Sequence, residues 1–241
     1  MGWETKLDEP WPSQAGPGPE RVVIVGTGES GAIAYEYFTY DSPHEVVAFS
    51  AEPAYITGGT YCGLPVVPLD DLASRYPPDV YRAFVAVSDV QLNRVRRRLF
   101  HAVKAAGFRC LSCISSRAFV LPSAVVGENV FIQEFTALQH GVRVGDNVFL
   151  GTGVCIGHSA VLEEDCYAGP HVAVCGSATV RRGTFLGAKS CVCDQVTVAE
   201  DCLIGAGAVV LEDTEPGRVY VGSPARPTGR DSYATRGVPV G

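Results

Sequence analysis

A six-residue repeat that runs without interruption from Val120 to Val209 is the feature that most constrains this chain. It comprises fifteen hexapeptides, whose first position is Val, Ile or Leu in fourteen cases and Ala168 in the other. The fifth position is always Ala, Val, Thr, Cys or Ser, and the preceding block, 114–119, fits the same pattern. One aliphatic residue at every sixth position is out of phase with a 3.6-residue helix. The repeat therefore predicts a parallel β-helix.

Three hexapeptides form one triangular coil, so the repeat predicts five coils stacked roughly 4.8 Å apart. The first-position side chains should form ladders inside the prism, and the small fifth-position side chains should let its walls approach each other. Such a core needs neither disulfides nor a metal ion to stabilise it.

Together with the segment Val221-Gly222-Ser223-Pro224-Ala225-Arg226 that follows it, the repeat resembles the left-handed β-helix (hexapeptide-repeat) acyltransferases. The resemblance alone supplies the left hand, because the usual crossover rule favours the right hand. It covers roughly residues 21–226 once the region before the repeat is included.

Length and charge narrow the class of protein further. A chain of 241 residues is expected to form one or two domains, and its net charge of −7 argues against nucleic acid as a partner. No apolar run reaches membrane-spanning length, and the first twenty residues have no hydrophobic signal core. These features predict a protein without a membrane span, located in the cytoplasm.

The nine cysteines are an odd number, so no disulfide scheme can pair them all. Cys166 and Cys202 occupy fifth positions of the repeat, where a small wall residue belongs. Cys110 and Cys113 form a C-x-x-C pair, but no second pair stands at the spacing of a zinc site. We therefore expect buried, reduced thiols.

The region before the repeat alternates strands and helices. Residues 1–20 are rich in Pro and Gly and are expected to form a flexible leader, with Trp3 or Trp11 as a possible anchor. Strands are predicted at 22–25, 45–49, 81–87 and 108–112, and helices at 32–40, 69–75 and 91–106. This order predicts a small parallel sheet covered by helices over 21–112, about half of a dinucleotide-binding fold. The β-helix should then occupy 113–215, and 216–241 a C-terminal segment and tail.

A glycine loop, Gly26-Thr-Gly28-Glu-Ser-Gly31, joins the first predicted strand to the first helix. Backbone amides at such a helix start can hold a phosphate, although a tight turn would need the same glycines. Glu52 stands about where a ribose-binding acid would lie, but the half-sized domain argues against NAD.

A small α/β domain followed by a β-helix resembles the NeuD-like sialic acid O-acetyltransferases and the bacillosamine-pathway N-acetyltransferases. The resemblance implies that the glycine loop holds the nucleotide of a nucleotide-linked sugar. This chain has Gly28-Glu29-Ser30-Gly31 where the N-acetyltransferases often have Gly-His-Gly. The nucleotide-binding candidates are Gly26, Gly28, Glu29, Ser30, Gly31 and Glu52.

His158, at the third position of its hexapeptide, is the catalytic candidate by the same resemblance. A third-position side chain should point outward, and a neutral imidazole can accept the proton of an attacking amine or hydroxyl near pH 7. The N-acetyltransferases often have an acid directly after this histidine, whereas this chain has Ser159. Ser159 itself, or Glu134 or Asp146 from a neighbouring coil or chain, is a candidate for orienting the ring.

His140 precedes His158 by eighteen residues, so it should lie one coil below on the same edge, as a substrate contact or a solvated side chain. His171 should lie on another edge, one coil below Lys189, where it could reach the substrate across a subunit interface. Three histidines also raise the possibility of a γ-carbonic-anhydrase-like zinc protein, but spacings of 18 and 13 do not reproduce that ligand pattern. No metal is expected.

The last coils and the segment after them resemble the coenzyme-binding end of these enzymes. The candidates for contacting acetyl-CoA are Gly176, Gly187, Lys189, Gly205, Gly207, Pro224, Ala225 and Arg226. The resemblance also implies a homotrimer with the site between subunits.

The sequence thus predicts an acyl-CoA-dependent, homotrimeric acyltransferase, with acetyl-CoA as donor and an amino group of a nucleotide-linked sugar as acceptor. O-acetylation of a sugar hydroxyl and acylation of a small antibiotic-like amine remain alternatives. From other classes, a non-catalytic trimeric scaffold and the zinc protein remain less favoured.

Overall fold

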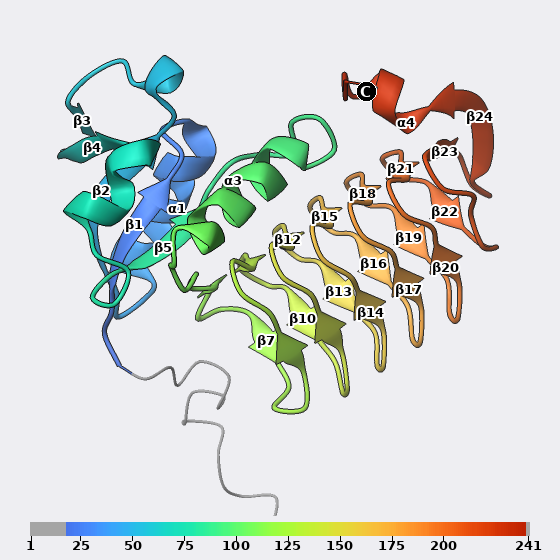
Figure 1. The fold of residues 1–241 in the computed structure, drawn as a ribbon. Coiled ribbons are helices and arrows are strands. Elements are labelled where there is room, and N and C mark those ends of the chain that lie inside the picture. The colour runs from blue at the N-terminus through green and yellow to red at the C-terminus, as the bar shows by residue number, and fades with distance from the viewer. Residues whose placement is uncertain (1–17, 240–241) are drawn as a thin grey trace, which may run out of the picture.

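The computed structural model describes residues 18–239, which form an α/β unit packed against a three-sided prism of short strands (Figure 1). Most of the expected leader, including Trp3 and Trp11, lies outside the described residues. No helix within the described range is long and apolar enough to cross a membrane.

The α/β unit is built on a five-stranded sheet of order β3-β4-β2-β1-β5. Its strands are β1 (Arg21–Val25), β2 (Glu45–Ala51), β3 (Thr60–Tyr61), β4 (Leu64–Pro68) and β5 (Arg82–Val85). β1, β2, β4 and β5 are parallel. Four consecutive apolar residues of β1 are fully buried, as expected of a central parallel strand covered on both faces.

Two details of this sheet differ from the sequence prediction. The short strand β3 pairs antiparallel with β4, so the edge of the sheet is a hairpin and the sheet is mixed. The strand predicted at 108–112 does not form, and only Cys110 bridges Ala83. The reason is that the chain passes to the prism directly after this bridge: Ser112 Oγ donates to Gly127 O at 2.7 Å and Cys113 N to Val130 O at 2.8 Å.

The helices cover both faces of the sheet. They are α1 (Glu29–Tyr40), α2 (Leu72–Arg75) after a 3₁₀ turn at Leu69–Asp71, and α3 (Arg94–Ala105), with a further 3₁₀ turn at Pro53–Tyr55. α3 begins three residues later than predicted because 91–93 have positive φ angles of 54°, 51° and 62°. Its apolar side, which includes Leu99, Phe100 and Val103, packs in the core of the sheet.

The repeat forms the predicted prism, whose strands are two residues long and join the sixth position of one hexapeptide to the first position of the next. Each strand pairs in parallel with the strand eighteen residues away, as Cys155 does with Ala137 and Ala173. Face 1 consists of β7 (Phe119–Val120), β10 (Ala137–Leu138), β13 (Cys155–Ile156), β16 (Ala173–Val174), β19 (Cys191–Val192) and β22 (Val209–Val210).

The strands that the repeat contributes to the other two faces follow the same spacing, and two later strands extend face 3, the last of them antiparallel. Face 2 consists of β8 (Val125–Val126), β11 (Arg143–Val144), β14 (Val161–Leu162), β17 (Thr179–Val180) and β20 (Thr197–Val198). Face 3 consists of β6 (Cys113–Ile114), β9 (Phe131–Ile132), β12 (Phe149–Leu150), β15 (Tyr167–Ala168), β18 (Phe185–Leu186), β21 (Leu203–Ile204), β23 (Arg218–Val221) and β24 (Arg226–Asp231). We name the corners by the faces they join: edge 1–2, edge 2–3 and edge 3–1.

The interior of the prism follows the repeat position by position. First-position side chains such as Ile132, Ile156 and Val180 are fully buried, and the fifth-position Cys166 and Cys202 are 1% and 0% exposed. Both expectations are confirmed. The fourth position shows a further regularity that was not predicted. Its φ lies between 56° and 70° in fourteen of the fifteen hexapeptides. This left-handed corner explains why Gly, Asn, Asp and Ser recur there.

The α/β unit is fixed to the prism along edge 2–3 by α3 and a buried polar ladder. Asn129 accepts a hydrogen bond from Val85 N at 2.7 Å and donates to Asn147 at 2.8 Å. Asn147 donates in turn to Asp165 at 2.7 Å, and Arg97 pairs with Asp165 at 3.2 Å. The two parts therefore share one buried interface.

The C-terminal residues return to the same edge (Figure 1). After β24, the short helix α4 (Ser232–Thr235) places Tyr233, whose hydroxyl donates to Asp201 at 2.7 Å. Arg94 of α3 pairs with the same Asp201 at 2.8 Å, and Arg236 forms an ion pair with Asp89. The chain end thus lies against α3 as well as against the last coils.

Candidate functional site

A cavity of about 530 Å³ opens at the carboxyl end of β1, where the glycine loop turns into α1. Of the nucleotide-binding candidates, five line this cavity: Gly26, Gly28, Glu29, Ser30 and Glu52. The sixth, Gly31, is buried beneath the loop, where an added Cβ would lie 2.2 Å from Gly26 O. Gly26 itself has φ 130°, and its Cβ would lie 2.4 Å from Ala86 O. Packing therefore requires Gly26 and Gly31, whereas Gly28 faces open space.

Glu52 lies on the wall of this cavity in a fixed orientation. Arg98 donates two hydrogen bonds to its carboxylate, at 2.7 and 2.9 Å. These hydrogen bonds hold the pKa of Glu52 below its ordinary value. Glu52 therefore presents an ionised acceptor of the kind that binds a hydroxyl group.

His158 lies on edge 1–2 in a column of third-position residues one coil apart, which also contains His140, Gly176 and Asp194. The His158 side chain is exposed, and its backbone N–H donates to Gln139 at 3.1 Å. The ring extends over Gly176, because a Cβ on Gly176 would lie 2.5 Å from His158 Nε2. The absent side chain of Gly176 thus creates the space that the imidazole occupies.

The carboxylate of Asp194 approaches the same space from the coil beyond. Its Oδ1 lies 3.1 Å from the position of the absent Gly176 Cβ. Sequence reasoning missed Asp194, although the eighteen-residue period places it two coils from His158 on the same edge. Its carboxylate and the imidazole of His158 therefore border the same gap.

His140 lies one coil below His158 in this column, as the spacing of eighteen residues predicts. Ser159 N donates to His140 O at 2.8 Å, so the two histidine turns are stacked. The His140 ring contacts Ser123 Oγ at 3.0 Å, and Ser159 has a left-handed φ of 57°. His140 and Ser159 are therefore close to His158 in one chain.

Other candidates lie on different edges. Glu134 is on edge 3–1, where it accepts hydrogen bonds from Tyr37 and, at 2.8 Å, from Thr152. Asp146 is on edge 2–3 and accepts from Glu128 N at 2.8 Å. Neither acid approaches His158 of its own chain. His171 and Lys189 stand at successive left-handed corners of edge 3–1, with φ 58° and 59°.

The glycines proposed for the coenzyme fall into three kinds. Gly187 and Gly205 are required by packing, because their Cβ atoms would lie 2.6 Å from Ala206 N and 2.9 Å from Val221. Gly207, at φ 69°, borders open space, and Gly176 borders His158. Beyond the last coil, Pro224 and Arg226 are exposed, whereas Ala225 is buried.

The thiols are more varied than expected. All nine cysteines are free, and Cys110, Cys113, Cys166 and Cys202 are buried. Cys62 and Cys155 are exposed, because they occupy a hairpin turn and an outward sixth position, so the expectation of uniformly buried thiols is wrong for them. Within residues 18–239, no group of three or more His, Cys, Asp or Glu side chains is arranged to hold a metal ion.

Comparison with known proteins agrees with this architecture. Residues 123–158 match the family model of the bacterial transferase hexapeptide (six repeats). The comparison with curated proteins gives no match.

Solved structures match over most of the chain. A histidine-to-asparagine variant of perosamine N-acetyltransferase from Caulobacter crescentus, in complex with CoA and GDP-perosamine, is 29% identical with a TM-score of 0.77, over 87% of this chain and 97% of that one. The acetyltransferase domain of PglB from Neisseria gonorrhoeae, in complex with acetyl coenzyme A, is 26% identical with a TM-score of 0.77, over 87% of this chain and 100% of that one.

WeeI from Acinetobacter baumannii shares the fold at 20% identity, with a TM-score of 0.73 over 87% of this chain and 99% of that one. The likeness thus extends over the α/β unit and the prism together, and it bears out the left-handed coil. The chain thus resembles the hexapeptide-repeat acyltransferases of the left-handed β-helix type and matches bacterial sugar N-acetyltransferases over most of its length, which supports an acetyl-CoA-dependent acyltransferase.

Proposed function

We propose that this protein transfers an acetyl group from acetyl-CoA to an amino group of a nucleotide-linked sugar, with His158 as the general base. The observation that carries the proposal is the exposed imidazole of His158, held over Gly176 beside the carboxylate of Asp194. The cavity at the glycine loop supports a nucleotide-linked acceptor, and the CoA and GDP-perosamine complexes of a structural relative support both substrates.

The proposed reaction is a direct transfer. The sugar amine attacks the thioester carbonyl carbon, and Nε2 or Nδ1 of His158 accepts the proton that the amine loses. The tetrahedral intermediate then collapses, the carbon–sulfur bond breaks, and the CoA thiolate takes the proton from the imidazolium. An amide product and free CoA thiol result, so atoms and charges balance without a covalent acyl-enzyme.

The geometry favours a site shared between chains of a homotrimer. The glycine-loop cavity belongs to the α/β unit, which rests on face 3 and edge 2–3, whereas His158 lies on edge 1–2. In one chain the base and the acceptor pocket therefore belong to different sides of the prism. A threefold arrangement would bring the His158 edge of one chain to the acceptor pocket of the next.

Two experiments test these proposals. Acetyl-CoA would be mixed with a panel of nucleotide-linked amino sugars, the released thiol followed, and the acetylated atom identified by mass spectrometry and NMR. Acetylation of a hydroxyl in place of the amine, or turnover with none of the panel, would contradict the proposed acceptor.

Light scattering gives the oligomeric state, and subunit complementation tests whether the site is shared. His158→Ala chains would be co-expressed with chains that have an intact His158 but a blocked glycine-loop cavity, such as Gly28→Trp. Activity should return in the mixed oligomer although each parent is inactive. A monomer in solution, or mixed oligomers without activity, would rule out the shared site.

A further inference from the structure

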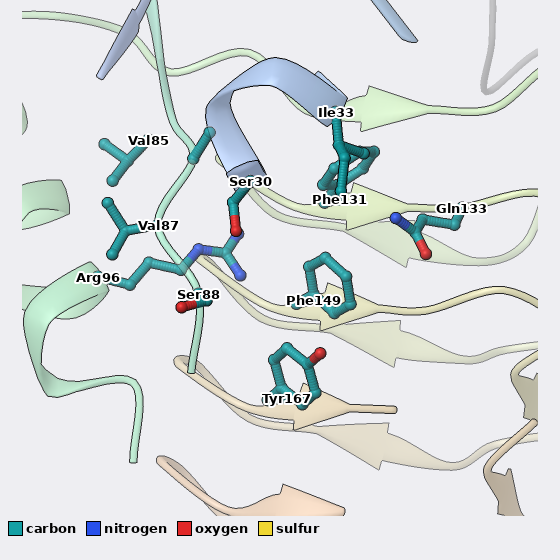
Figure 2. Close-up of a pocket in the computed structure, with 11 residues that line it drawn as sticks. Ser30, Ile33, Val85, Val87, Ser88, Arg96, Phe131, Gln133, Phe149 and Tyr167 are labelled. Carbon is teal, nitrogen blue, oxygen red and sulfur yellow. The ribbon is translucent and has the colours of Figure 1, made fainter. Parts of the chain in front are cut away.

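A second, smaller cavity of about 120 Å³ lies between the α/β unit and face 3 of the prism (Figure 2). It shares four lining residues with the glycine-loop cavity: Ser30, Ala86, Val87 and Ser88. The two cavities therefore meet at the start of α1. No candidate from the sequence analysis other than Ser30 lines the smaller one.

Arg96 of α3 projects into this smaller cavity (Figure 2). The residue is 3% exposed, and its guanidinium lies 6.0 Å above the ring of Phe149. Nη2 donates to Asn129 O at 2.9 Å, while the buried Nε has no hydrogen-bond partner among the described residues. Burial lowers the pKa of Arg96 to about 10, which leaves the group charged at neutral pH.

No carboxylate of the described residues forms an ion pair with this buried charge. The nearby Asp165 favours the charged form of Arg96, but Arg97 pairs with its carboxylate at 3.2 Å and Asn147 donates to it at 2.7 Å. A buried charge without an ion pair is costly, so an anion bound beside Arg96 would stabilise it.

The remaining polar groups of the cavity are suited to the same ligand. Each can donate a hydrogen bond, and none is a carboxylate: Ser30, Ser88, Gln133 and Tyr167. The twelve-residue helix α1 begins beside them, and its N-cap Gly28 makes no side-chain capping bond. The N-terminal end of a helix carries partial positive charge, which adds to the attraction for an anion.

We propose that the cavity around Arg96 is an anion subsite that receives a phosphoryl group where the two cavities meet. The proposal rests on the proposed function for its ligand, the diphosphate of a nucleotide-linked sugar. The nucleoside would occupy the larger cavity, and the phosphoryl oxygens would accept hydrogen bonds from Ser30, Ser88 and Arg96. Free phosphate or pyrophosphate offers the same oxygens, so the experiment includes both sources.

Isothermal titration of the full chain would compare four probes: inorganic phosphate, inorganic pyrophosphate, a nucleoside and the matching nucleoside diphosphate. We expect the nucleoside diphosphate to bind more tightly than the nucleoside by at least about 10-fold. Binding of pyrophosphate alone at comparable affinity would assign the subsite to the free anion. Equal affinity for nucleoside and nucleoside diphosphate would overturn the proposal.

Two variants link this binding to the cavity. Ser88→Asp places a carboxylate in the wall of both cavities at an exposed position, and Arg96→Met removes the buried charge. Each should weaken diphosphate binding at least about 10-fold more than it weakens nucleoside binding. Ser74→Asp and Arg75→Met, which are exposed on α2, serve as matched controls. If Arg96→Met does not fold, Ser88→Asp still decides the matter.

The outcome is separable from that of the proposed function. Unchanged diphosphate binding in Ser88→Asp would refute the anion subsite even if acetyl transfer to a sugar amine is observed. Diphosphate binding that depends on Ser88 and Arg96, without any acetyl transfer, would refute the proposed acceptor but leave the subsite standing.

Discussion

The imidazole of His158 and the carboxylate of Asp194 approach the same point from coils on either side of Gly176. His158 Nε2 lies 2.5 Å, and Asp194 Oδ1 3.1 Å, from the position that a Gly176 side chain would occupy. The two residues are separated by two periods of eighteen, so the repeat itself aligns them. If His158 is the proposed base, Asp194 is therefore the acid of the same chain that is placed to orient its ring.

Replacing His158 by Ala should abolish most turnover without disturbing the fold. The side chain points outward, so its removal creates no core cavity, and donor binding should persist. Loss of a positioned general base typically costs about 10²–10⁴-fold in rate. Steady-state kinetics with the identified acceptor would measure kcat, and CoA titration would measure donor affinity. Wild-type kcat in the variant would place the base elsewhere, with His140 the next residue to test.

Asp194→Asn should lower kcat by about 10-fold or more, because the base remains but loses its orienting charge. This loss should be smaller than that of His158→Ala. Steady-state kinetics with the identified acceptor would measure kcat for both variants.

The control for this experiment is Glu200→Gln, which changes an exposed third-position acid on edge 2–3. Asp194→Glu should recover part of the activity. An Asp194→Asn variant with unchanged kcat would show that Asp194 has no role in positioning.

Gly176→Ala should reduce turnover through the His158 ring. The backbone of Gly176 does not have a positive φ, so Ala fits the fold, but its Cβ would displace the far end of the imidazole. A displacement of about 1 Å at a catalytic group can cost around 10²-fold in rate. Gly59→Ala, in a loop with no neighbour within 4 Å of the new Cβ, is the control. Equal kcat in both variants would mean that ring position does not limit the reaction.

The prism could be predicted from the sequence because the residues that cause it recur in a local, six-residue pattern. A buried first position and a small fifth position recur every six residues, and Ile156 and Cys166 occupy the positions that the register assigned to them. The position of His158 on an outer edge followed from the same register. The strand at 108–112 is reduced to one bridge because the chain passes to the prism directly after it, where Cys113 N donates to Val130 O.

Asp194 and Arg96 were not predicted as candidate site residues, because their surroundings depend on packing that a local sequence pattern does not contain. The eighteen-residue period places Asp194 in the column of His158, but its approach to the His158 ring becomes visible only because Gly176 leaves a gap between them. Arg96 is one of four arginines between positions 94 and 98, and only the docking of α3 on the prism decides that it is the buried one. Glu134 was a sensible acid in sequence, yet Tyr37 and Thr152 hold it on another edge.

Thiol reactivity should separate the cysteines into classes. Burial raises the pKa of Cys110, Cys113, Cys166 and Cys202, and none is accessible, so all four should resist labelling until the protein unfolds. Cys62 in its exposed turn should react in the native state. Mass spectrometry after timed labelling would assign each site. Rapid native labelling of Cys166 or Cys202 would contradict the register of the repeat.

Asn129→Ala should destabilise the junction between the α/β unit and the prism. Asn129 Oδ1 accepts from Val85 N at 2.7 Å, and Nδ2 donates to Val85 O at 3.2 Å and to Asn147 at 2.8 Å. All of these groups are buried, and an unsatisfied buried polar group costs about 1–3 kcal/mol. Denaturant unfolding should therefore show that the free energy of unfolding of the variant is lower by about 1–3 kcal/mol.

The matched control is Gln195→Ala, because Gln195 is also a fourth-position residue but is exposed. Its φ of 63° compares with 56° at Asn129, so both variants place Ala in a left-handed corner at similar conformational cost. The difference between their free energies of unfolding then isolates the side-chain hydrogen bonds of Asn129. Hydrogen exchange at the Val85 amide should accelerate only in Asn129→Ala. Equal destabilisation by both variants would mean that the buried ladder contributes nothing beyond its backbone conformation.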